Sequence, residues 1–190
     1  MSVPERTASP RSDFDQPVVG KTTTVSLPGR EKVKLCGIPA GSFTIGSPAG
    51  ETDSGDHEKQ VRVTLTKAFW MTATEFTQAQ WQAVMGSNPS EFKGADLPVE
   101  MVRWNEVQDC LKAMNSKAPL PAGWQWALPT EAQWEYACRA GTTTVFSFGD
   151  MATGAEANFD GNFPTASRGR EPISARLWAG KPVPASPPRW

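Results

Sequence analysis

Glycine and proline divide this chain into short segments, and this constrains its fold more than any other feature. The 190 residues contain 16 glycines and 17 prolines, together about 17%, above the usual share of about 12%. Connectors such as residues 86–90 and 118–123 separate three short helical patterns, and no strand–helix–strand alternation is present. A doubly wound parallel sheet is therefore excluded, and we expect much of the backbone to be loop.

Three helix starts share the same chemistry. Thr77, Asn105 and Thr130 are each followed three residues later by glutamine, at Gln80, Gln108 and Gln133. The two threonine versions have the pattern of a capping box, in which the N-cap and the third helical residue exchange hydrogen bonds, and the asparagine version is closely related. These patterns predict helices beginning at the three caps.

The second and third helical patterns also predict which side faces the core. After Asn105 the apolar face recurs at i, i+3, i+4 and i+7, which places Cys110 in the core. In the third helix Trp134, Ala137 and Cys138 share a face, so we expect the Cys138 thiol to be packed as well. Glu135 and Arg139 stand four residues apart and can form an ion pair.

Strands are predicted upstream of these helices. Residues 38–47 form a short apolar run that enters a turn, and residues 61–65 alternate apolar and polar side chains like a half-buried strand. Residues 69–71 are expected to continue the buried part, and residues 49–59 form an acidic loop.

Charge and histidine content exclude several functions. Nineteen basic and 20 acidic residues give a net charge of −1, which does not favour a nucleic-acid partner. His57 is the only histidine and lies in a polar turn. A histidine-rich metal site is therefore excluded, and a Ser-His-Asp triad would have to use His57.

The cysteines are too few and too scattered for a disulfide framework or a CxxC metal site. We interpret Cys36, Cys110 and Cys138 as three reduced, buried thiols, and one disulfide with a leftover thiol is the alternative. The first residues have no apolar stretch typical of a signal peptide, and no run of about 18 apolar residues could span a membrane. We therefore expect a soluble, cytoplasmic protein without a membrane partner.

Both ends of the chain differ from its middle. Residues 1–26 are polar, dotted with proline and aperiodic, so we expect a flexible N-terminal arm. Residues 164–190 form an irregular, proline-rich basic tail, with Arg168, Arg170, Arg176, Lys181 and Arg189 against one acid, Glu171. Either the reading frame shifts or ends near this point, or this is an ordinary basic tail.

Four segments of the intervening region resemble a known family. They are IPAGSFTIGSP at 38–48, TEFTQAQW at 74–81, LPVEMVRWN at 97–105 and, most specifically, LPTEAQWEYACRAG at 128–141. In this order they are similar to motifs of the formylglycine-generating enzyme family, also called the sulfatase-modifying factor domain. The resemblance covers residues 30–163, and we assign residues 27–163 to the N-terminal part of such a domain.

The resemblance implies a fold and an activity. The fold would be α+β, related to C-type lectins, with little regular secondary structure, and incomplete in its C-terminal half. The activity would be the oxygen-dependent conversion of a sulfatase cysteine to Cα-formylglycine. The partner would then be a sulfatase-type Cys-x-Pro-x-Arg peptide, and the family cofactors are copper(I), held by two cysteines near the C-terminus, and calcium.

The sequence departs from the family where that copper site should be. No cysteine follows Cys138, so we assign no catalytic residue and expect no copper in this chain. The resemblance places calcium ligands at Asn158 and at the backbone carbonyl of Phe159, although the further ligands downstream do not match. Asn158 as a simple turn residue is the alternative.

Three functional hypotheses follow. The chain could be an enzyme of the formylglycine-generating type, which the missing cysteines argue against. It could be a non-catalytic module that binds a peptide or another ligand on the same fold. It could also be a truncated fragment without an independent function. The fold alone does not decide between them, and the sequence does not define the oligomeric state.

Overall fold

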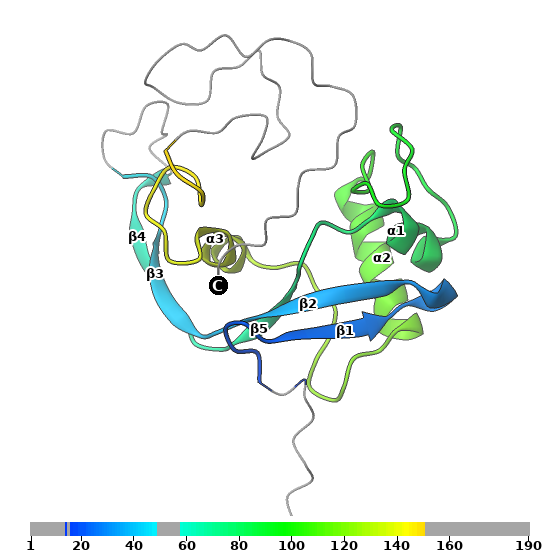
Figure 1. Ribbon diagram of the computed structural model, residues 1–190, viewed down its shortest axis with the longest axis horizontal. Helices are drawn as coiled ribbons and strands as arrows, with labels where there is room; N and C mark the ends of the chain where they lie inside the picture. Colours follow the sequence, from blue (N-terminus) through cyan, green and yellow to red (C-terminus); the bar gives the residue numbers. More distant parts are fainter. Residues whose placement is uncertain (1–13, 15, 49–57, 151–190) are drawn as a thin grey trace, which may run out of the picture.

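The computed structural model describes residue 14 and residues 16–48 and 58–150, and all structural statements below concern these residues (Figure 1). They form an α+β fold, as expected. The elements in chain order are β1 (Thr22–Ser26), the short 3-10 helix η1 (Pro28–Arg30), β2 (Lys32–Ile38), β3 (Gly41–Ile45), β4 (Val61–Leu65), β5 (Phe69–Thr72), α1 (Gln78–Met85), α2 (Trp104–Lys117) and α3 (Glu131–Arg139). The strands form two antiparallel sheets, ordered β1-β2-β5 and β3-β4.

The three-stranded sheet contributes one face to the core. In β2, Val33 and Leu35 are buried while Lys32 and Lys34 are exposed, which is the two-residue period of a strand with one face in solvent. Helices α1 and α2 lie together near one end of this sheet (Figure 1). The buried core that they share with it comprises Phe14, Leu27, Val33, Leu35, Trp81, Val84, Cys110, Met114, Ala118 and Trp126.

Trp126, in the segment that follows α2, is hydrogen-bonded to that helix. Its side chain is 9% exposed, and its indole Nε1–H donates to the carbonyl of Ala118, the C-cap residue of α2, at 2.8 Å. Asn115 holds the Trp126 backbone from both sides, accepting from its N–H and donating to its carbonyl, each at 2.9 Å. The chain therefore leaves α2 in a fixed direction toward α3.

A buried glutamine organises the loop after α1. The Gln78 side chain is 1% exposed and donates from Nε2 to the carbonyls of Phe92, at 2.7 Å, and Pro98, at 3.2 Å. Its Oε1 accepts from the Asn88 amide at 2.8 Å and from the Gly94 N–H at 3.1 Å. All the hydrogen-bonding groups of this side chain are thus used to hold residues 88–98 against α1.

The two threonine caps are confirmed and the asparagine cap is wrong. Thr77 and Thr130 both form the capping box with the glutamine three residues later. Helix α2 instead begins at Trp104 with Arg103 as its N-cap, and the Glu106 carboxylate accepts from the Arg103 N–H at 2.6 Å. A negative carboxylate at this position satisfies a free N–H group and complements the helix dipole, so the helix starts two residues earlier than an Asn105 cap would allow.

The flexible arm expected over residues 1–26 is wrong at its end. Thr22–Ser26 pair with β2 along their whole length, and the Phe14 ring packs 5.5 Å from the rings of both Trp70 and Trp124. Residues 22–25 are three threonines and a valine, which suit a strand even in a polar stretch. The other domain limits stay predictions, and the tail 164–190 lies outside the described residues.

The predicted strand over residues 38–47 is divided in two. Strand β2 ends at Ile38, Pro39 and Ala40 intervene, and β3 runs from Gly41 to Ile45 in the other sheet. Proline cannot donate to a strand ladder, which explains the break. The strand predicted over residues 61–65 is confirmed as β4. Residues 69–71, which were expected to be buried, lie in β5 and are half-buried. Of the helices described, none combines the length and the apolar character needed to cross a bilayer.

Alkaline pH is expected to destabilise the fold through Cys110. Burial raises the pKa of this thiol to about 11, an effect that Lys117 partly offsets. Folding makes this thiol harder to ionise, so ionisation favours the unfolded state. The stability that depends on the protonated thiol is therefore fully present below the pKa of the thiol in the unfolded chain, and it is lost as the pH rises from there toward the pKa in the folded protein. Between about pH 8 and about pH 10.5 the free energy of unfolding should fall by about 2 kcal/mol more than in Cys110→Ala, as measured by urea unfolding. Equal pH dependence in both proteins would contradict this.

Candidate functional site

A cleft of about 560 Å³ lies where the β3–β4 sheet meets α3 and the chain that follows α3. The C-terminal end of strand β3 forms one wall of the cleft and helix α3 forms another. Residues 145–148 line the opposite side. The described residues that line the cleft are Ile45, Gly46, Ser47, Glu58, Lys59, Val61, Glu131, Trp134, Glu135, Cys138, Arg139, Val145, Phe146, Ser147 and Phe148. Its volume lies within the range typical of small-ligand and peptide-side-chain sites.

Helix α3 packs against β3. The Thr130 capping box defines its first turn, and Ala137 is buried on its inner side. The Tyr136 ring packs on Phe43 of β3, with ring centres 5.3 Å apart. A side chain at Gly41 would collide with the Tyr136 hydroxyl, so glycine at this position permits the close approach of α3 and β3.

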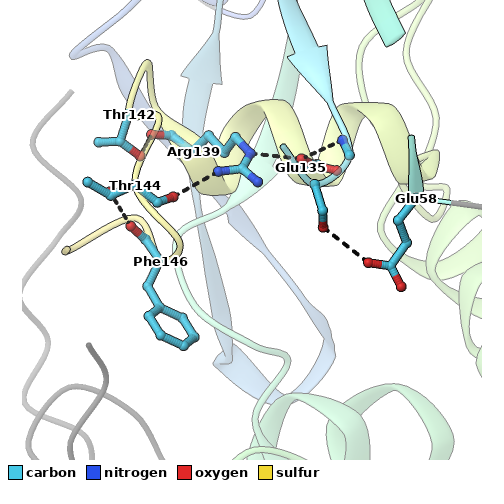
Figure 2. A network of polar contacts seen from close by, with 8 residues as sticks. Glu58, Glu135, Arg139, Thr142, Thr144 and Phe146 are labelled. Atoms are coloured by element: carbon cyan, nitrogen blue, oxygen red, sulfur yellow. Dashed lines mark hydrogen bonds and ion pairs between the residues drawn. The ribbon is translucent and has the colours of Figure 1, made fainter. Parts of the chain in front are cut away.

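Glu135 and Arg139 form the predicted ion pair, and it connects three segments (Figure 2). Arg139 Nε donates to Glu135 Oε1 at 2.7 Å, and the same oxygen accepts from the Gly46 N–H at 3.3 Å. Arg139 Nη1 reaches the Thr144 carbonyl at 3.1 Å, and the Thr144 hydroxyl donates to the Phe146 carbonyl at 2.6 Å. Both charged side chains are about four-fifths buried, so this network is a structural support for the wall of the cleft.

The rim next to β3 is closed by Ser47 and Glu58. The Ser47 hydroxyl donates to Glu58 Oε2 at 3.1 Å, and the Ser47 N–H donates to the Glu58 carbonyl at 2.8 Å. Gly46 precedes them with φ of 96°, and a side chain there would clash with the Glu58 backbone. This left-handed, crowded position favours glycine.

One stripe of α3 stays exposed to the cleft. Glu131, Trp134 and Cys138 stand at i, i+3 and i+7, and all three are exposed. Across from them, Phe146 and Phe148 stack with ring centres 5.5 Å apart and planes 4° from parallel. The lining of the cleft thus combines an indole, two phenyl rings, a thiol, three carboxylates and two cationic side chains.

The expectation of three buried cysteines is confirmed for Cys110, holds only in part for Cys36 and is wrong for Cys138. All three cysteines are free, with Cys110 buried, Cys36 half-buried and Cys138 exposed. Helix α3 packs on β3 through Tyr136, Ala137 is buried, and the side that carries Trp134 and Cys138 borders the cleft. Helical spacing had placed these residues together correctly but could not show which side was covered.

The other predicted site residues lie outside the described part of the chain. These are His57 and the calcium candidates Asn158 and Phe159. Within residues 14, 16–48 and 58–150, no group of three or more histidine, cysteine, aspartate or glutamate side chains could hold a metal ion. The calcium site stays a prediction.

The thiols do not fit a copper(I) site built from two cysteines. Copper(I) prefers soft thiolate ligands. Among the described residues that line the cleft, Cys138 supplies the single thiol. Cys110 faces the core with a raised pKa, which favours the protonated thiol, and Cys36 lies on β2 in the other sheet. We therefore derive no chemical step through copper.

Sequence patterns missed the cleft residues Glu131, Phe146 and Phe148. The sequence indicated Glu131 only as a residue of the first turn of a helix, with no sign of a cleft beside it. The Phe-Ser-Phe sequence at 146–148 has the alternation of a short extended segment, which could have suggested that both rings lie on one side. The cleft itself depends on β3, which is 86 or more positions away from α3 in the sequence. No local pattern encodes such a contact.

Comparison of the sequence with known protein families identifies the class of protein to which this fold belongs. The sulfatase-modifying factor enzyme 1-like domain matches residues 23–185, and the chain belongs to this family. The family assignment made from the four motifs is thereby confirmed.

Individual relatives agree with this assignment. The chain is 26% identical to the bovine (Bos taurus) formylglycine-generating enzyme over 86% of its own length and 56% of the relative. It is 33% identical to the chaperone protein LppX of Paenibacillus barcinonensis over 42% of its own length and 38% of the relative. The chain therefore spans little more than half of one of these relatives and less than half of the other.

A solved structure supports the fold. Treponema denticola variable protein 1 superposes with a TM-score of 0.55 and 25% sequence identity, covering 66% of this chain and 59% of that protein. The α+β fold of the family is thus confirmed by structure as well as by sequence.

Proposed function

We propose that this chain is a ligand-binding member of its family that holds a polypeptide segment in the cleft and does not oxidise it. The observation that carries the proposal is the collection of exposed apolar side chains around the cleft. Val61, Trp134, Val145 and Phe148 are 57%, 54%, 37% and 48% exposed, and all four line it. Exposed apolar side chains that gather around a hollow are typical of binding sites.

The aromatic lining suits a peptide. Tryptophan contributes strongly to binding because a large, rigid surface is buried at low entropic cost. Trp134 stands on a helix that is fixed by Tyr136 and the Glu135–Arg139 pair, so little ordering is needed when a ligand binds. The family supplies the kind of partner, a sulfatase, and one relative carries the name chaperone, a class that binds polypeptides.

Oxidation of a sulfatase cysteine is the second candidate function. It is favoured by the similarity to the bovine formylglycine-generating enzyme. The donor set described above argues against it, since the family chemistry uses two thiolates and the cleft offers Cys138 alone among its described residues. The two functions share the cleft and a peptide ligand, and they differ in whether the peptide leaves chemically changed.

Loss of Trp134 is expected to weaken peptide binding. Trp134→Ala should raise the Kd of a Cys-x-Pro-x-Arg peptide by about 30-fold or more, since central tryptophans contribute about 2 kcal/mol or more. Isothermal titration calorimetry measures this. Trp104→Ala is the matched control, because Trp104 is 68% exposed on α2 and does not line the cleft. Equal affinities of the two variants would contradict a binding site at this cleft.

A mass measurement separates the two candidate functions. The full chain is incubated with the same peptide, copper(I) and oxygen, and the peptide is then analysed by mass spectrometry. We expect the unchanged peptide to be recovered. Conversion of its cysteine to an aldehyde that depends on the chain would overturn the non-catalytic proposal in favour of the oxidase.

A further inference from the structure

Glu131 and Trp134 have neighbouring side chains on the wall of the cleft. They stand three residues apart on α3, which places them on one face of the helix. Glu131 is exposed, Trp134 is 54% exposed, and both line the cleft. A carboxylate attracts a cation by ion pairing, and the face of an indole attracts the same cation through its quadrupole. The two side chains thus favour a cationic group at one place.

The other charged groups of the cleft do not neutralise Glu131. Arg139 is paired with Glu135 at 2.7 Å and donates to the Thr144 carbonyl at 3.1 Å. The side chain of Glu131 forms no ion pair or hydrogen bond with the residues that the structure describes, and these include both cationic residues of the cleft, Arg139 and Lys59. Three glutamates against one lysine and one arginine leave a net charge of −1 on the described lining.

Capping of α3 does not occupy the Glu131 carboxylate. The capping box is formed by Thr130 and Gln133, whose side chains accept from each other's backbone N–H at 3.2 Å and 2.9 Å. A carboxylate in the first turn of a helix also complements the helix dipole, but this interaction does not use a specific oxygen atom. Both oxygens of Glu131 therefore stay accessible to a donor from a ligand.

The aromatic lining of the cleft favours arginine among the cationic side chains. Phe146 and Phe148 stack with ring centres 5.5 Å apart, and such apolar walls exclude water and so strengthen a nearby charge interaction. A long side chain can lay its apolar stem along rings and keep its charged end at Glu131. The planar guanidinium of arginine stacks on an indole and donates two parallel hydrogen bonds to a carboxylate, whereas the ammonium of lysine is a point charge.

We propose that Glu131 and Trp134 determine which polypeptides the cleft holds, by binding an arginine side chain of the ligand between the carboxylate and the indole. The choice among polypeptides rests on the proposed function of the cleft, whereas the affinity of the pair for a guanidinium group does not. Lysine binds at the same place more weakly. A neutral side chain of the same shape as arginine loses both attractions.

A double-mutant cycle between protein and peptide tests the selection. The Cys-x-Pro-x-Arg peptide is compared with versions that carry lysine or the neutral analogue citrulline in place of arginine. With the unaltered full chain, the citrulline peptide should have a Kd about fivefold higher, with lysine in between. In Glu131→Gln the difference between arginine and citrulline should shrink to about twofold, the part that Trp134 supplies. Isothermal titration calorimetry measures each Kd, and the cycle cancels any effect of the substitution on the helix itself.

Glu91→Gln is the matched control for the change in net charge. Glu91 is exposed and does not line the cleft, so this variant should keep the fivefold preference of the unaltered chain. Equal affinities of the unaltered chain for the arginine and citrulline peptides would overturn the inference and leave the binding function intact. An undiminished preference in Glu131→Gln, or an equal loss in Glu91→Gln, would overturn it as well.

A small arginine derivative distinguishes failure of this inference from failure of the proposed function. N-acetylarginine methylamide is titrated into the full chain at constant ionic strength, and the indole N–H resonance of Trp134, identified with Trp134→Phe, is followed by NMR. The resonance should shift with the arginine derivative, shift much less with the citrulline derivative, and shift much less in Glu131→Gln. A shift without binding of any peptide would support the cation position and contradict the peptide function. No shift would overturn the cation position, whether or not the peptides bind.

Discussion

Replacing Gln78 by alanine is expected to lower the free energy of unfolding by about 3–5 kcal/mol. The substitution removes a side chain that is 1% exposed and makes four hydrogen bonds to the loop that follows α1. It removes one hydrogen-bond partner from each of two carbonyls, one amide and one backbone N–H, and each lost bond in a buried setting costs about 1 kcal/mol or more. Urea unfolding followed by circular dichroism measures the change.

A glutamine on the same helix provides the control. Gln82 is exposed one turn further along α1, and Gln82→Ala should change the free energy of unfolding by less than about 0.5 kcal/mol. Gln78→Glu is a second test, because it keeps the oxygen acceptor but turns the donor that faces the Phe92 and Pro98 carbonyls into an oxygen. If the two alanine variants were equally stable, the buried network would not hold the loop.

The second large effect is expected at Trp126. Trp126→Ala should cost about 3–5 kcal/mol, because it opens a cavity in the core and removes the bond from the indole to the Ala118 carbonyl. For a chain of this size the melting temperature should fall on the order of 10 °C. Differential scanning calorimetry measures this.

Two further variants divide the effect of Trp126 into parts. Trp126→Phe keeps most of the apolar volume and loses the indole N–H, so it should cost about 1–3 kcal/mol, mainly through the Ala118 carbonyl left without its partner. Trp104→Ala removes an equally large but 68% exposed side chain and should cost less than about 1 kcal/mol. An equal loss in Trp104→Ala and Trp126→Ala would contradict the assignment of Trp126 to the core.

Local rules predicted local structure well. The capping boxes at Thr77 and Thr130, the pair of Glu135 with Arg139 and the buried face of α2 all depend on residues within one or two turns, and all are confirmed. Two errors, the Asn105 cap and the undivided strand over residues 38–47, were local misreadings, and the missed strand β1 is one that a distant partner decides. Strand β1 is polar in composition and is a strand because β2 pairs with it.

The candidate site was harder to predict than the fold for the same reason. The spacing of Trp134 and Cys138 showed that they share a face but not that this face borders a cleft. That depends on Tyr136 meeting β3 at Gly41 and on Glu135 meeting Gly46, a hydrogen bond across 89 positions of sequence. Resemblance to a family supplied the global arrangement that spacing could not.

The bonds of the Glu135 carboxylate have a consequence for how the cleft selects what it binds. One oxygen atom links the end of β3 to α3, and through Arg139 the link extends to the strand-like turn that carries Phe146. Three walls of the cleft, of which only β3 is distant in sequence, are therefore connected by one ion pair, and they separate only if a charge that is about four-fifths buried loses its partner. The cleft should therefore select ligands by a shape that is already formed in the free protein. Ligands too bulky for this shape should bind weakly, because the walls do not move apart to fit them.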